Sequence, residues 1–219
     1  MAPTQVGLEA GGKRVFVWAT GWPGWCRSGR DEEQALAALT AYAPRYAVVA
    51  AEAGLPFPPA AGDPPDLTVT ERTTGSGGTD FGVPGEVVES DREPLDAAEA
   101  ERQTALLAAA WRVFDGVVER APAELRKGPR GGGRDRDKIV DHVLGAEPAY
   151  ARQLGLRLRQ PAADDETAVA AHRQAILDLL RSPWDGTVER RWPPRYAVRR
   201  FAWHVLDHAW EIEDRTERQ

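Results

Sequence analysis

Residues 195–215 read RYAVRRFAWHVLDHAWEIEDR, and the spacing of the apolar residues in this stretch predicts a helix. His204 and His208 are four residues apart, so at about 100° per residue both imidazoles project from one face, one turn apart. Phe201 and Val205 lie on the same side, which directs the histidines toward a packed interior. Buried imidazoles need polar neighbours or a metal ion, and this pair has the spacing to bind one metal ion together.

The opposite face of the same helix is also apolar, because it carries Trp203, Leu206 and Trp210. A helix with two apolar faces is usually covered on both sides. We therefore expect this second face to pack against an N-terminal domain or against a second subunit, which would make the protein a homodimer. The alternative is that the tryptophans belong to the core of the helical part itself.

Length and composition are those of a folded globular protein of two domains. The chain has 219 residues, of which 42% are hydrophobic and 28% charged. Its net charge of −6 and pI near 5.4 argue against a nucleic-acid-binding protein, because a phosphate-binding surface usually appears as an excess of Lys and Arg. A small molecule is the expected partner.

The cysteine content and the N-terminal residues favour a cytoplasmic protein. Cys26 is the single cysteine, so neither an intramolecular disulfide nor a multi-cysteine zinc site can form. We interpret it as a packed small side chain. The first residues lack the apolar core of a signal peptide, and no run approaches the ~18 apolar residues of a membrane span, so no membrane contact is expected.

The first 90 residues predict a small α/β domain. Residues 15–20 and 25–28 have strand character on either side of a Gly-Trp-Pro-Gly turn, and residues 67–72 alternate as a later strand would. Asp31 with Gln34 forms the pattern of a capping box that starts a helix. Pro44 is expected to end or kink that helix, or to open a second one. Proline-rich residues 55–66 predict no regular element, and glycine-rich residues 75–85 predict a flexible loop.

This N-terminal order of elements resembles the HicB-like fold, in which a strand, a Pro-Gly turn, a second strand and an E-E-x-A-L helix follow one another. The matching residues are Trp22-Pro23-Gly24-Trp25 and the sequence DEEQAL at 31–36. The resemblance covers about 35 residues. It implies a β-β-α unit, and it does not imply the toxin partner of that family.

The remainder of the chain, from residue 91 to residue 219, predicts a four-helix bundle. Its helices are expected at residues 94–121, 135–158, 164–181 and 195–215, each with apolar residues three and four apart. Pro148 lies inside the second of these, so a kink is expected there. The complete prediction is an α+β protein with a small α/β domain at 1–90 and a bundle at 91–219.

His142 is the expected third metal ligand. It lies on the second predicted helix at the edge of the apolar stripe, whereas His172, on the third helix, is interpreted as a structural or surface residue. One histidine from one helix and an i, i+4 pair from another can form one face of a metal coordination sphere. Three neutral nitrogens suit Zn²⁺, Ni²⁺, Fe²⁺ or Cu²⁺, and zinc is the first expectation.

With these three histidines, residues 94–215 resemble the DinB/YfiT-like superfamily of metal-binding four-helix bundles. The matching residues are His142 in KIVDHVLGAEPAYARQLG, and His204 with His208 in FAWHVLDHAWEIEDR. The resemblance implies a divalent metal and, from several members, a thiol-dependent S-transferase or isomerase. Its cofactor would be a low-molecular-weight thiol such as mycothiol, held as a thiolate for attack on a small electrophile.

Glu211 is the candidate catalytic residue, because it follows His208 by three residues on the same face. It could be a fourth ligand, orient a ligand histidine, or act as a base. Arg215 could pair with it across one turn. The competing hypothesis for the whole protein is a non-catalytic metal-binding or interaction protein, in which the ion joins two helices.

Overall fold

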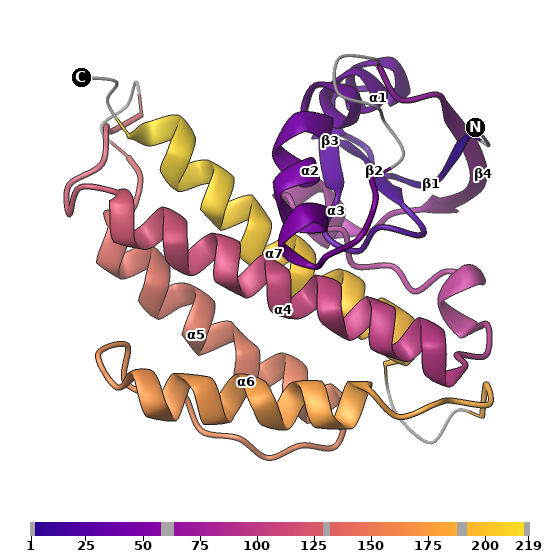
Figure 1. Cartoon of the computed structure of the whole chain (residues 1–219). Helices are drawn as coiled ribbons and strands as arrows, with labels where there is room; N and C mark the ends of the chain where they lie inside the picture. The colour runs from indigo at the N-terminus through magenta and orange to yellow at the C-terminus, as the bar shows by residue number, and fades with distance from the viewer. Residues whose placement is uncertain (1–2, 58–63, 129–131, 188–191, 217–219) are drawn as a thin grey trace.

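The computed structural model describes residues 3–57, 64–128, 132–187 and 192–216. Within these ranges the chain forms a mixed α+β structure with one four-stranded sheet and seven α-helices (Figure 1). Among the described helices, none combines the length and the apolar character needed to cross a membrane. The expectation of mixed α+β structure is thus confirmed, while the predicted division into two domains at residue 90 stays a prediction.

The sheet contains one strand more than the sequence patterns predict. Its strands are β1 (Thr4–Ala10), β2 (Val15–Ala19), β3 (Cys26–Gly29) and β4 (Leu67–Thr74), in the order β3-β2-β1-β4. β1 is antiparallel to β2 and parallel to β4, and its register with β4 shifts between Val6 and Gly7. The later strand expected at 67–72 therefore closes one edge of the sheet.

The sequence patterns did not predict β1 because two of its residues are atypical for a strand interior. Gly7 leaves room for the indole of Trp18, since a Cβ at this position would lie 2.4 Å from a ring carbon. Glu9 is fully buried, and its carboxylate accepts hydrogen bonds from the Thr79 hydroxyl at 2.5 Å and from the backbone of Glu86 at 3.0 Å. Trp18 lies on the neighbouring strand β2, whereas Thr79 and Glu86 are 70 and 77 residues from Glu9 in the sequence.

The two faces of the sheet pack against different helices, as the alternation along β2 requires. Val17 and Ala19 point into the core that includes Leu39 of α1 (Glu32–Ala41). Phe16 and Trp18 point to the other face, where they form a second cluster with Cys26, Val88 and Trp203. The sheet therefore lies between α1 and the C-terminal helix.

Around the sheet, one expected feature is confirmed and another is wrong. Asp31 caps α1 by accepting a hydrogen bond from the Gln34 amide at 2.8 Å, and Pro44 opens a second helix, α2 (Ala43–Glu52). The loop expected at 75–85 instead contains a short helix, α3 (Gly77–Phe81). Ser76 is the N-cap of this helix, and the hydroxyl of Thr79 in its first turn accepts a hydrogen bond from the Ser76 amide at 2.8 Å. Of the proline-rich stretch, residues 58–63 lie outside the described residues.

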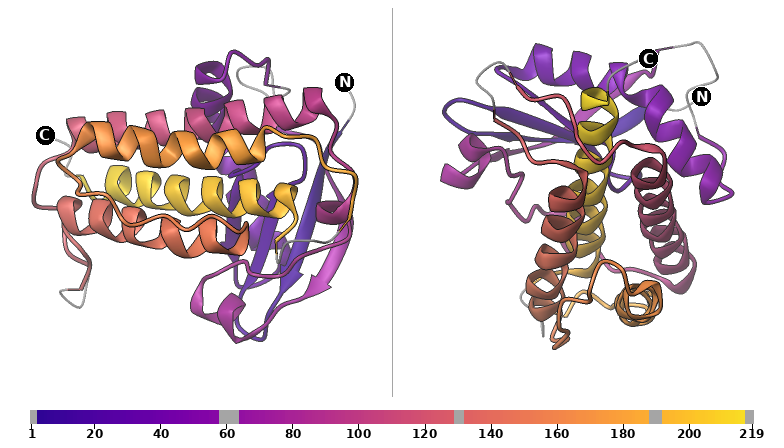
Figure 2. Two further views of the ribbon diagram at one scale, coloured as in Figure 1. Left: turned by 90° about the horizontal axis from the view of Figure 1, so that it is seen from below. Right: turned by 90° about the vertical axis from the view of Figure 1, so that its left-hand side faces the viewer.

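The four long helices follow at nearly the expected positions. They are α4 (Ala97–Arg120), α5 (Arg136–Gln153), α6 (Glu166–Leu180) and α7 (Pro194–Arg215), and a single 3₁₀ turn, η1 (Ser90–Arg92), precedes them. The end-on view shows all four helices on one side of the sheet, with α4 and α7 nearest to it and α5 and α6 farther away (Figure 2). The predicted end of the second helix at 158 is wrong, because Gly155 takes a left-handed conformation (φ +87°). α5 continues through Pro148, and the expected kink there stays a prediction.

The tryptophan face of α7 packs against the N-terminal part of the same chain. The ring centroids of Trp203 and Phe16 are 6.2 Å apart, and those of Trp210 and Tyr42 are 5.1 Å apart. The helix comes so close to the β2–β3 turn that a Cβ on Gly24 would lie 2.7 Å from Leu206. This confirms the first of the partners expected for that face.

Candidate metal centre

The structure brings the three predicted ligand histidines together. His142 lies on α5, and His204 and His208 lie on consecutive turns of α7. One side-chain nitrogen from each lies within 4.8 Å of the other two, and no other group of three histidine, cysteine or carboxylate ligands does so among the residues the structure describes. The ring centroids are separated by 4.8 to 5.2 Å, and the rings are steeply inclined to one another.

The separation of two ligand nitrogens fits a tetrahedral ion. Nε2 of His142 and Nε2 of His204 are 3.3 Å apart. Two nitrogens bound to zinc at about 2.0–2.1 Å with a tetrahedral angle would lie about 3.3–3.4 Å apart. His204 is only 7% exposed, while His142 and His208 are partly exposed, so the site is reachable from one side. The donor set and its spacing therefore fit a divalent metal.

Glu211 lies behind His208 rather than beside the other imidazoles. Its Oε2 is 2.8 Å from Nδ1 of His208, and its Oε1 accepts a hydrogen bond from Arg215 at 2.6 Å. When Nδ1 donates to the carboxylate, Nε2 of His208 is left with a free lone pair for a metal. This geometry favours the orienting role among the three that the sequence leaves open. The assignment of Glu211 as a catalytic residue stays a prediction.

The electrostatics favour the neutral, metal-binding form of two of the ligand histidines, His142 and His204. Burial, reinforced by the neighbouring His208 and His142, lowers the pKa of His204 to about 2. Burial also lowers the pKa of His142, with His208 and Arg134 acting in the same direction. The hydrogen bond from His208 lowers the pKa of Glu211. At neutral pH His142 and His204 are therefore neutral imidazoles, and Glu211 is an ionised carboxylate.

Two residues next to the histidines complete one wall of the site. The ring of Tyr150 lies 5.6 Å from that of His204, and Arg200 points toward the Tyr150 hydroxyl with a nitrogen–oxygen distance of 3.3 Å. Arg200 also lies over the ring of Trp203, 4.7 Å from its centroid. Sequence patterns did not identify Arg200 as a neighbour of the site. The signal that could have identified Arg200 is its position three residues before a buried tryptophan.

His172 and Cys26 take no part in this site, as expected. His172 is buried and its Nε2 lies 3.3 Å from a carboxylate oxygen of Glu147, whose other oxygen accepts from the indole of Trp111 at 2.7 Å. Cys26 is 1% exposed, and burial raises the pKa of its thiol to about 12. Glu147 is a buried carboxylate that sequence patterns did not identify, because its partners come from α4 and α6.

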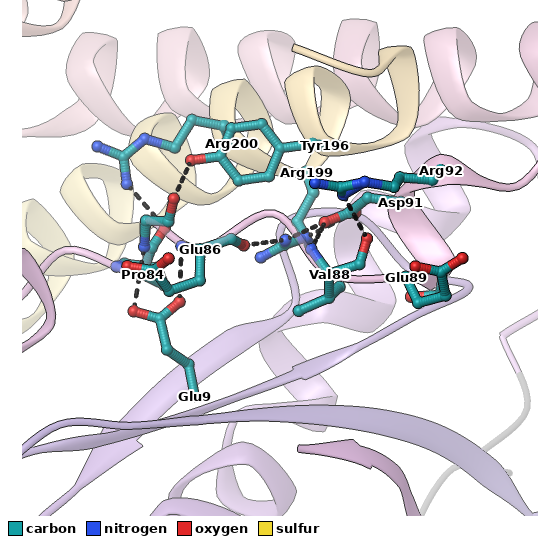
Figure 3. Close-up of polar contacts among 12 residues, drawn as sticks. Glu9, Pro84, Glu86, Val88, Glu89, Asp91, Arg92, Tyr196, Arg199 and Arg200 are labelled. Atoms are coloured by element: carbon teal, nitrogen blue, oxygen red, sulfur yellow. Dashed lines mark hydrogen bonds and ion pairs between the residues drawn. The ribbon is translucent and has the colours of Figure 1, made fainter. Parts of the chain in front are cut away.

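On the sheet side of α7, a different polar network holds the segment that connects α3 to η1 (Figure 3). Arg199 is 7% exposed and donates to Asp91 at 2.5 Å and to the Glu86 carbonyl at 3.1 Å. Tyr196 donates to the carbonyl of Gly85 at 2.8 Å. These contacts fix the start of α7 against the sheet, and so they set the position of the histidines that follow.

Comparison with known proteins adds no relative: no family model matches the chain, and neither the curated proteins nor the solved structures gave a match.

Proposed function

We propose that this protein is a metal-dependent enzyme of the DinB-like thiol S-transferase type. It would use a low-molecular-weight thiol similar to mycothiol, or water, to attack a small electrophile. The observation that carries the proposal is the convergence of His142, His204 and His208, with two Nε2 atoms at the separation a tetrahedral ion requires. We also propose that α4–α7 form a DinB-like bundle and that the N-terminal part is a HicB-like unit.

Each residue has a distinct part in this proposal. The three histidines would hold the metal, which lowers the pKa of a bound thiol or water so that a nucleophile exists at neutral pH. Glu211 fixes the ring orientation and tautomer of His208 through the 2.8 Å contact with Nδ1. Arg215 in turn fixes Glu211. Arg200 and Arg134 add positive charge near the histidines, which favours an anionic nucleophile such as a thiolate.

The competing proposal is a structural metal without catalysis. It is supported by the fact that the ligands come from two helices, α5 and α7, so an ion would join them. The His204 side chain is also buried, which is typical of a closed structural site. Turnover separates the two proposals, since a structural metal stabilises the fold and produces no reaction.

Metal content is the first experiment. The purified wild-type chain is expected to hold close to one metal ion per chain by plasma mass spectrometry, with zinc as the main species. The double variant His142→Ala, His204→Ala is expected to hold almost none. Retention of metal by the double variant, or its absence from the wild-type chain after zinc has been supplied, would overturn the site. His172→Ala is the matched control, because it removes a histidine outside the triad.

Turnover is the second experiment. Mycothiol and glutathione are each incubated with 1-chloro-2,4-dinitrobenzene, from which the thiolate displaces chloride, and formation of the thioether product is followed. Product that forms with the wild-type chain and disappears in His142→Ala, His204→Ala supports the enzyme. A folded, metal-containing chain that gives no product with any thiol supports the structural metal instead.

A further inference from the structure

Arg200, one helical turn before His204 on α7, differs from the other arginines of that helix in having no carboxylate partner. Each of the other three forms an ion pair: Arg195 with Glu99, Arg199 with Asp91 and Arg215 with Glu211. Arg200 forms none with any residue that the structure describes, although its side chain is partly buried. Its positive charge is therefore available to an anion that is not part of the described chain.

Neutral groups hold the guanidinium of Arg200 in place. Its Nη1 donates to the carbonyl of Pro84 at 3.1 Å (Figure 3), and its Nη2 donates to the hydroxyl of Tyr150 at 3.3 Å. It also lies over the rings of Tyr150 and Trp203, 5.2 and 4.7 Å from their centroids. Aromatic rings attract a cation without neutralising it. Each terminal nitrogen carries two N–H groups, so one N–H on each has no acceptor among the described residues.

The hydroxyl of Tyr150 supplies a further donor beside this guanidinium. A guanidinium cannot accept a hydrogen bond, so the hydroxyl must be the acceptor in its contact with Arg200. Its own O–H donates to no residue that the structure describes. The ring of Tyr150 packs edge-on against Phe201 and His204, with centroid distances of 5.4 and 5.6 Å, which holds the hydroxyl next to Arg200.

These donors lie within reach of a small molecule bound to the three histidines. Arg200 precedes His204 by four residues, so the two side chains project from one face of α7, about 6 Å apart along the helix axis. A short molecule that binds the metal at one end can therefore place its other end at Arg200 and Tyr150. A carboxylate suits them, because it has one negative charge and two oxygens for a guanidinium N–H and a hydroxyl O–H.

We propose that Arg200 and Tyr150 bind the carboxylate of the small molecule that occupies the metal centre. This inference rests on the proposed function and names its substrate class: either the thiol or the electrophile carries a carboxylate. Arg200 donates an N–H to one oxygen, and Tyr150 donates its O–H to the other. The two residues determine specificity and take no part in holding the metal.

Binding of short thiols to the cobalt-loaded full chain tests the proposal. Co²⁺ replaces Zn²⁺ because a thiolate bound to it gives a charge-transfer absorption band, which reports binding without turnover. The probe 3-mercaptopropionate presents a thiolate and a carboxylate, and 3-mercapto-1-propanol is its control of equal chain length without the carboxylate. If the carboxylate belongs to the thiol, 3-mercaptopropionate is expected to bind about tenfold more tightly than the control.

A second arm covers a carboxylate that belongs to the electrophile. Propionate is titrated by calorimetry into the cobalt-loaded chain saturated with 3-mercapto-1-propanol, and its binding would assign the carboxylate to the electrophile. Equal Kd values for the two thiols, together with no binding of propionate, would overturn the proposal and leave the metal centre standing. A chain that takes up no Co²⁺ overturns the proposed function, and this inference with it.

Three substitutions locate the carboxylate, each made in a chain whose Co²⁺ content is measured first. Arg200→Gln removes the cation and is expected to abolish the preference for 3-mercaptopropionate or the binding of propionate. Tyr150→Phe keeps the ring and removes the O–H, and it is expected to weaken the same binding about three- to tenfold. Arg152→Gln is the matched control, because it removes an exposed arginine two residues from Tyr150 on α5, and the Kd should not change. An unchanged Kd in both Arg200→Gln and Tyr150→Phe would overturn the assignment.

Discussion

The two sides of α7 both bury polar side chains, but they satisfy them differently. On the sheet side, Arg199 is neutralised by Asp91 and its remaining donors reach a backbone carbonyl. On the side facing α5, the imidazoles of His142 and His204 have mainly each other, with their nitrogens 3.3 Å apart. A buried polar group with complete partners holds a fold together, whereas ring nitrogens that converge from two helices at the spacing of metal ligands indicate a place for an ion.

The largest effect is expected when the buried Arg199–Asp91 ion pair on the sheet side of α7 is broken. Arg199→Met leaves the Asp91 carboxylate buried without its cation, and we expect the free energy of unfolding to fall by about 3–5 kcal/mol, measured by urea denaturation. Adding Asp91→Leu to this variant should recover most of the loss, because no buried charge then remains. A loss below about 1 kcal/mol for Arg199→Met would show that the pair contributes no more than a surface ion pair.

The sequence predicted one side of α7 better than the other for a physical reason. The histidine side follows from spacing within two helices, so His142, His204 and His208 could be selected from periodicity together with a family resemblance. The Arg199 side depends on η1 and β1, where Gly7 and Glu9 have no strand pattern of their own. Gly7 makes room for Trp18 on the neighbouring strand, while Glu9 and Arg199 bind partners 70 and 108 residues away, and no local pattern contains that information.

The next largest effect is the stabilisation of the fold by zinc at the histidine side of α7. Zinc at 100 times its Kd is expected to raise the free energy of unfolding of the wild-type chain by about 2.7 kcal/mol, because the ion binds the folded state. The double variant His142→Ala, His204→Ala should show no such gain. The midpoint of urea denaturation with and without zinc measures this, and an equal gain in both proteins would contradict a site on these residues.

In the metal-free protein, acid is expected to lower the free energy of unfolding through the histidine side of α7. The folded-state pKa of His204 is about 2, well below its ordinary 6.5, so between these values only the unfolded state binds the proton. The stability of the folded state therefore falls as the pH drops below about 6.5, by about 2 kcal/mol at pH 5 for this one group. Urea titrations at about pH 7.5 and pH 5 measure the loss, and His204→Phe should remove most of it. An unchanged loss in His204→Phe would assign the acid sensitivity to other groups.

The smallest expected effect sharpens the role of Glu211. Glu211→Ala removes the carboxylate that holds His208, and we expect zinc affinity to fall about tenfold, or ~1.4 kcal/mol, without loss of the site. Glu213→Ala is the matched control, because Glu213 lies two residues along the same helix, near Arg45. Competition with a chromophoric chelator gives both affinities. Complete loss of zinc binding in Glu211→Ala would instead make Glu211 a direct ligand.

The position of α7 in the chain has a consequence for synthesis on the ribosome. All four strands are translated before α7. The face of the sheet formed by Phe16 and Trp18 therefore cannot pack against Trp203 until α7 has left the ribosome. The group of three histidines is likewise incomplete until His204 and His208 have been translated. An exposed aromatic face on a growing chain is prone to aggregation or to chaperone binding. The same late step therefore protects the sheet and assembles the three histidines, so a nascent chain that ends before α7 would have neither.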